Sequence, residues 1–138
     1  MNKEFVTYEQ ALALKELGFD EPCFGSWEID YCKVPTYTHS IRCFGSEFYK
    51  NSNHSKGKIT APLYQQAFRW FRKEHGLYSS IIPKKSWPDD YVTGIEFYVS
   101  ICGGDGKEIG PEGVFSCEEA EQACLNKLIE IVKQSANK

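Results

Sequence analysis

The stretch IEFYVSICGGDGKEI, residues 95–109, decides the fold of this chain. Apolar residues at every second position alternate with Glu96, Tyr98 and Ser100, which is the pattern of a strand with one buried face. GGDG, residues 103–106, has the composition of a turn, so the chain is expected to return beside this strand. The stretch therefore predicts a hairpin, and a hairpin implies an antiparallel sheet.

The same alternation occurs earlier in the chain. In SWEIDY (residues 26–31), Trp27, Ile29 and Tyr31 occupy every second position, and in TYTHSIRCF (residues 36–44) Tyr37, His39 and Ile41 do so. Val34 and Pro35 lie near the expected turn, so these two segments predict a first hairpin. LYSSII, residues 77–82, is a short apolar run that predicts one further strand.

Three helices are indicated by their start and stop signals. The first begins with a capping box at Thr7 and ends before Gly18, a residue suited to the left-handed position after a helix. The last helix begins with a capping box at Ser116. Between them, we expect a helix that has Thr60 as its N-cap and ends at Gly76.

The element order is therefore α-β-β-α-(β)-β-β-α, which predicts an α+β fold. Strands joined by short turns imply one antiparallel sheet of four to five strands, with the three helices on one face. The length of 138 residues suits a single domain, residues 1–138. GSEFYKNSNHSKGK, residues 45–58, has neither period and is predicted to be a mobile loop.

Composition and charge exclude several classes of function. The net charge of −3 gives no general attraction to nucleic acid or to an anionic membrane. No stretch approaches the roughly 20 apolar residues that a membrane-spanning helix needs. The first 18 residues lack the apolar core of a signal peptide, so we expect a cytoplasmic protein with reduced thiols.

The sequence contains no recognisable catalytic, cofactor-binding or metal-binding motif. GGDGK resembles part of a phosphate-binding loop, but Ile101 occupies the place of the first glycine and Glu108 follows the lysine. No two of the six cysteines are separated by two residues, which removes the usual zinc and redox pairings. We therefore predict no catalytic residue, no cofactor and no metal, and we favour a protein that is not an enzyme.

The expected second helix, TAPLYQQAFRWFRKEHG (residues 60–76), contains both aromatic rings and cations. At 100° per residue, the rings fall on an arc of about 160° together with Leu63 and Ala67. The cations fall on the opposite side, so the rings are expected to form core and the cations to face solvent. A site that stacks a base would instead need rings and cations on one face.

The cationic side is the candidate ligand-binding surface, and it consists of Arg69, Arg72 and Lys73. In one hypothesis these residues act with three lysines of the predicted loop (Lys50, Lys56 and Lys58), and Trp87 supplies a stacking ring. In the alternative, the cations are an ordinary solvated face and Trp87 closes the rim of the core.

Three segments carry a resemblance to a known family: FVTYEQALALKELGFDEPCFG (residues 5–25), APLYQQAFRWFRKEHGL (61–77) and CEEAEQACLNKLIEIVK (117–133). They resemble a family of small uncharacterised proteins from phages, prophages and mobile elements of anaerobic gut bacteria. The resemblance implies a small accessory protein of a bacterial cytoplasm, and it assigns no catalytic residues.

Three functions follow as hypotheses. The first is a non-enzymatic accessory protein, with an anti-defence role among its candidates, that binds a host protein or ligand. The second is a sponge that sequesters an anionic signalling nucleotide, and the third is a small enzyme without a recognisable motif. A symmetric homodimer that buries an exposed strand edge is a further arrangement that the sequence allows, and it would distinguish between these hypotheses.

Overall fold

A computed structural model describes residues 4–30, 38–43, 58–85, 95–104, 106, 108–110 and 116–136. The chain divides into two compact units, Met1–Ala67 and Phe68–Lys138. In chain order, the helices and strands are α1 (Tyr8–Glu16), β1 (Gly25–Asp30), β2 (Thr38–Cys43), β3 (Lys58–Ala61), α2 (Tyr64–His75), β4 (Tyr78–Lys85), β5 (Ile95–Cys102), β6 (Glu108–Ile109) and α3 (Cys117–Ala136).

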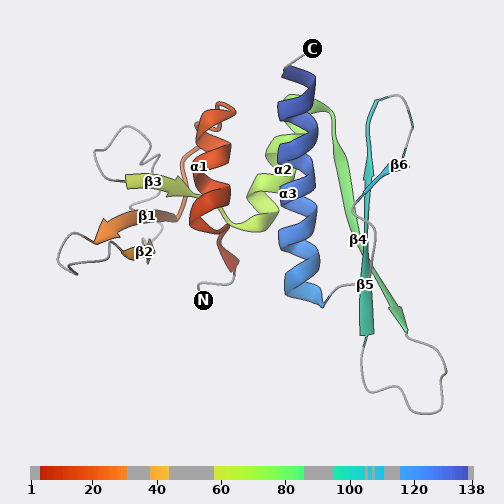
Figure 1. Cartoon of the computed structure of the whole chain (residues 1–138), viewed down its shortest axis with the longest axis horizontal. Coiled ribbons are helices and arrows are strands. Elements are labelled where there is room, and N and C mark those ends of the chain that lie inside the picture. Colours follow the sequence, from red (N-terminus) through yellow and green to blue (C-terminus); the bar gives the residue numbers. More distant parts are fainter. Residues whose placement is uncertain are drawn as a thin grey trace. The chain divides into compact units, whose positions relative to one another are not determined.

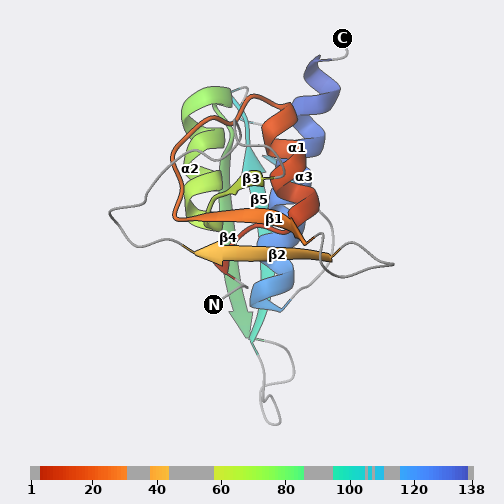
Figure 2. The same ribbon diagram turned by 90° about the vertical axis from the view of Figure 1, so that its left-hand side faces the viewer.

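The first unit contains a three-stranded antiparallel sheet of order β2-β1-β3. Figure 2 shows β1 and β2 running side by side in opposite directions. Trp27 of the central strand β1 pairs with Ile41 on one side and with Ile59 on the other. The indole Nε1 of Trp27 donates to the Val6 carbonyl at 2.8 Å, which ties the sheet to the segment before α1.

The predicted capping box of α1 is confirmed. The Thr7 hydroxyl accepts from the Gln10 backbone N–H at 3.2 Å, and the Gln10 side chain accepts from the Thr7 N–H at 3.0 Å. Gly18, with φ of 97°, follows the helix in the left-handed conformation that the sequence predicts for it. Gln10 is buried and also accepts from the Tyr64 hydroxyl at 2.9 Å, so one side chain joins the start of α1 to the start of α2.

Gly25 permits a close approach that any larger residue would prevent. A Cβ atom at this position would lie 2.6 Å from the ring of Phe5, which is itself buried. We expect Gly25→Ala to lower the free energy of unfolding by roughly 1–3 kcal/mol, the usual cost of overpacking a core. Urea unfolding measures this loss, and Gly104→Ala is the matched control because a Cβ there meets no atom within 4 Å. Equal stability of the two variants would contradict the prediction.

The second unit contains a three-stranded antiparallel sheet of order β4-β5-β6, and helix α3 packs along it (Figure 1). β4 and β5 pair along their whole length, from Tyr78 with Cys102 to Lys85 with Ile95. Val99 and Ile101 of β5 are buried. On α3 the buried residues recur with helical spacing: Ala120, Cys124, Leu125, Leu128 and Ile129. The predicted hairpin at residues 95–109 and the predicted strand at 77–82 are thus confirmed.

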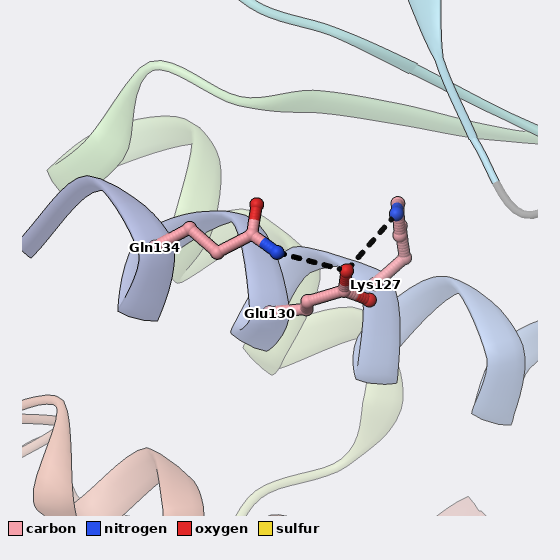
Figure 3. Close-up of polar contacts among 3 residues, drawn as sticks. All are labelled: Lys127, Glu130 and Gln134. Carbon is pink, nitrogen blue, oxygen red and sulfur yellow. Dashed lines mark hydrogen bonds and ion pairs between the residues drawn. The ribbon is translucent and has the colours of Figure 1, made fainter. Parts of the chain in front are cut away.

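The opposite side of α3 is polar and carries its own ion pair. Glu130 accepts from Lys127 Nζ at 3.3 Å and from Gln134 Nε2 at 3.1 Å (Figure 3). Such exposed contacts within a helix contribute about 0.2–0.5 kcal/mol per pair. At the other end of the helix, Ser116 is the N-cap, as predicted, because its hydroxyl accepts from the Glu119 N–H at 3.3 Å and donates to Glu119 Oε1 at 2.9 Å. The second bond of a capping box, from the Ser116 N–H to the Glu119 side chain, is not among the contacts of the described residues.

The α+β class and the three helices are confirmed, and two details of the prediction change. The described residues form two three-stranded sheets rather than one sheet of four to five strands. Strand β3 was not predicted, and Thr60 belongs to it instead of being the N-cap of α2. The reason lies in Pro62, because the residue before a proline is disfavoured in the helical conformation. The Pro62 carbonyl accepts a hydrogen bond from the Val6 N–H at 3.1 Å, and α2 begins only at Tyr64.

Several predictions fall on parts of the chain that the structure does not describe. Of the predicted mobile loop at 45–58, only Lys58 is described, as the first residue of β3. The turn near Val34 and Pro35 lies outside the described residues. The single domain over residues 1–138 stays a prediction.

Candidate functional site

The aromatic side of α2 is buried. The exposed fractions of Tyr64, Phe68, Trp70 and Phe71 are all 5% or less. The ring of Trp70 lies edge-on to that of Phe71, with centroids 5.0 Å apart, and edge-on to that of His75 at 4.9 Å. The prediction that these rings form core is confirmed, so they offer no free face to a base.

The cationic side of α2 is exposed. Arg69, Arg72 and Lys73, here called the α2 cation face, are exposed on one side of the helix. They are three and four residues apart, so their like charges disfavour one another. The residues three and four positions before and after them on the helix include no aspartate or glutamate. This contrasts with Lys127 of α3, whose charge is paired with Glu130.

Part of this charge has a structural explanation. Arg72 and Lys73 lie in the last turn of α2, where a cation stabilises the partial negative charge of the helix end. Arg69 lies one turn earlier, where that effect has faded. The interaction with the helix end therefore does not account for the charge of Arg69, the remaining member of the α2 cation face.

The helical wheel is wrong about the environment of Gln66. The wheel places it on the cationic side, but its side chain is buried, with an exposed fraction of 9%. Its Nε2 donates to the Pro22 carbonyl at 2.9 Å and to Glu21 Oε1 at 3.3 Å. A wheel cannot reveal this, because the residues that cover Gln66 come from a segment more than 40 positions away.

The other residues of the proposed ligand site are not brought to the α2 cation face by any described contact. Trp87, Lys50 and Lys56 lie outside the described residues. Lys58 is described, and its ammonium lies 3.3 Å from Glu28 Oε1 in a half-buried ion pair. The role of Trp87 as a stacking ring stays a prediction.

A group of buried polar side chains in the first unit was not predicted. Ser26 of β1 is fully buried and pairs with Thr60 of β3, whose exposed fraction is 1%. The thiol of Cys23 is also buried and donates to the Glu21 carbonyl at 3.4 Å, and Thr60 and Gln66 both interact with it and lower its pKa. In sequence, these residues look like ordinary polar positions of half-exposed strands. The sequence signal is weak because a local pattern does not show which distant segments bury these side chains.

The buried thiols are protected from ionisation. Burial is the main cause that raises the pKa of Cys23 from 9.0 to about 11, against hydrogen bonds from Thr60 and Gln66 that lower it. Burial likewise raises the pKa of Cys124 to about 11, although a hydrogen bond with Ser79 lowers it. A nucleophilic cysteine needs its thiolate, so these two thiols are structural at neutral pH. Cys117 is exposed at the start of α3.

Within the described part of the chain, no three or more His, Cys, Asp or Glu side chains gather in a group that could hold a metal ion. None of the described helices has both the length and the apolar character that crossing a bilayer requires.

Comparison with known proteins gives no relative for this chain: no family model, no curated protein and no solved structure matches it. The case for a function therefore rests on the residues described above.

Proposed function

We propose that this protein is a non-enzymatic binding protein that contacts an acidic surface of another protein through the α2 cation face. The observation that carries the proposal is the exposure of Arg69, Arg72 and Lys73 on one side of a helix whose other side is buried. A rigid helix presents these charges with little loss of conformational freedom on binding. The resemblance to accessory proteins of phages and mobile elements makes a host protein of a bacterial cytoplasm the partner we favour.

The second candidate is the sequestration of an anionic signalling nucleotide. Arginine suits phosphate because its planar group binds two oxygens at once. Base stacking needs an accessible ring, and the four rings of α2 are buried, so this function depends on Trp87. For that reason we place it after protein binding.

The test of the first candidate is capture from a bacterial lysate by the immobilised protein, followed by titration of the captured partner. We expect the triple variant Arg69→Ala, Arg72→Ala, Lys73→Ala to bind at least tenfold more weakly, because each rim charge contributes on the order of 0.5–1 kcal/mol. Binding should also weaken as salt is added.

The matched control is the triple variant Lys15→Ala, Lys127→Ala, Lys133→Ala, which removes the same charge from α1 and α3. We expect it to bind like the natural protein. Equal losses in the two triple variants would mean that only net charge matters, and the role of the α2 cation face would then be refuted.

The nucleotide candidate is tested by thermal unfolding. A nucleotide at 100 times its Kd should stabilise the natural protein by about 2.7 kcal/mol and leave the stability of the variant Arg69→Ala, Arg72→Ala, Lys73→Ala unchanged. The absence of any stabilisation across a panel of cyclic nucleotides would exclude this candidate.

A further inference from the structure

Strand β4 is an edge strand. In the sheet order β4-β5-β6, β5 is the one neighbour that β4 has among the described residues. An edge strand presents unpaired backbone N–H and C=O groups, which can pair with a strand of another molecule. Proteins usually guard such an edge with proline, lysine or a covering segment.

The structure shows which backbone groups of β4 point outward. The Val99 carbonyl faces Gly110 on the β6 side, because a Cβ on Gly110 would lie 2.5 Å from that oxygen. Val99 therefore turns its backbone groups away from β4, and its partner Ile81 turns its own away from β5. Ser79 and Pro83 share the direction of Ile81. This explains why Pro83, which has no N–H, is tolerated in the strand.

Only the second half of β4 is guarded. Pro83, Lys84 and Lys85 occupy its end, whereas Tyr78 to Ile82 contains neither proline nor charge. Tyr78 and Ile82 have exposed fractions of 59% and 48%. They share one face of the strand, because they are four residues apart. The other face is turned to α3, which packs on β4 and β5 and whose Cys124 has its pKa lowered by Ser79.

We propose that the open half of β4 pairs with the same segment of a second copy of this chain, antiparallel and centred on Ser80. In this register Tyr78 lies opposite Ile82 of the other copy, and Ile82 opposite its Tyr78. Aromatic and β-branched side chains in such cross-strand pairs stabilise a sheet. Ser79 and Ile81 exchange backbone hydrogen bonds with Ile81 and Ser79 of the other copy, about four bonds in all.

The ends of the segment limit the pairing to this length. The next pair that could exchange backbone hydrogen bonds, beyond Ser79 and Ile81, would be Leu77 with Pro83. The Leu77 N–H already donates to the Phe71 carbonyl at 3.2 Å, and Pro83 has no N–H to give. The pairing has a two-fold axis at Ser80, so both copies use the same segment of β4. Such an interface gives a closed dimer and leaves no free copy of this segment to bind a third chain. The interface uses β4 and is independent of the α2 cation face.

Sedimentation of the natural protein over a range of concentrations tests the proposal. We expect a reversible dimer, and we expect Ile82→Lys to raise its dissociation constant at least tenfold while circular dichroism stays native. Leu12→Lys is the matched control, because Leu12 is exposed to a similar degree, 37%, on α1; it should leave the dimer unchanged. A monomer at roughly 1 mM would overturn the proposal, as would a dimer that Ile82→Lys does not weaken.

The register has its own test. In the proposed register, Ser80 lies opposite Ser80 of the other copy in a pair that exchanges no backbone hydrogen bonds. The Cα atoms of such a pair are about 4.5 Å apart, which is within the range that a disulfide spans. Under mild oxidation, Ser80→Cys should therefore link two copies through position 80, as mapped by mass spectrometry. Ser135→Cys, at an exposed position of α3, is the control that should not link. A dimer in which position 80 does not link, or links no faster than position 135, would refute this interface even if the chain dimerises elsewhere.

Discussion

Replacing Phe71 by alanine should lower the free energy of unfolding by about 3–5 kcal/mol. Phe71 has an exposed fraction of 0% and packs against the ring of Trp70 at 5.0 Å. Its removal takes apolar surface out of the core and leaves a cavity. Alanine is the best helix former, so a loss of stability must come from packing and not from the helix itself. Urea unfolding followed by tryptophan fluorescence measures the change.

The neighbouring residue provides the control. Arg72 is exposed on the same helix, and Arg72→Ala should change the free energy of unfolding by about 0.5 kcal/mol or less. The pair of variants therefore measures the division of α2 into a buried and an exposed side. If Phe71→Ala cost less than about 1 kcal/mol, the aromatic side would not be the core that we describe.

Stability should fall steeply between about pH 9 and pH 11. Burial raises the pKa of Cys23 and of Cys124 from 9.0 in the unfolded chain to about 11 in the folded one. A pKa raised by folding means that the folded state holds the proton more tightly. The corresponding stability is complete below pH 9 and is lost as the pH rises through 11. Each pKa unit corresponds to 1.36 kcal/mol, so each thiol should account for a loss of about 2–3 kcal/mol.

Unfolding measured at several alkaline pH values distinguishes these thiols from the lysines and tyrosines that titrate nearby. The double variant Cys23→Ala, Cys124→Ala should start less stable, because it loses packing, and should then show a shallower decline with pH. Cys117→Ala, at an exposed position, should decline like the natural protein. A double variant that declines as steeply as the natural protein would show that the two thiols are not the cause.

Much of the local structure could be predicted because it depends on contacts between near neighbours in the sequence. The N-caps at Thr7 and Ser116 each use a side chain that bonds three residues along the chain, and both are present; at Thr7 the full capping box forms. The hairpin of β5 and β6 follows from alternation and a short glycine-rich turn. The division of α2 into rings and cations follows from the helical period alone.

The predictions that changed depend on distant segments. β3 exists because Thr60 pairs with Ser26, 34 residues earlier, and because Pro62 receives a hydrogen bond from Val6. Gln66 is buried because Pro22 and Glu21 accept its amide hydrogens. A local sequence pattern predicts none of these contacts, because they join residues that are far apart in the chain.

The sequence by itself determined the α+β class, the three helices with the N-caps at Thr7 and Ser116, and the separation of rings from cations on α2. Each depends on the spacing of residues within one element, and that spacing fixes which side chains share a face. The tertiary structure alone decided that the strands form two sheets and that Ser26, Thr60 and Gln66 are enclosed. It also decided that the Tyr78 and Ile82 side of β4 lies at an edge, because strand order and burial depend on which distant segments pack together.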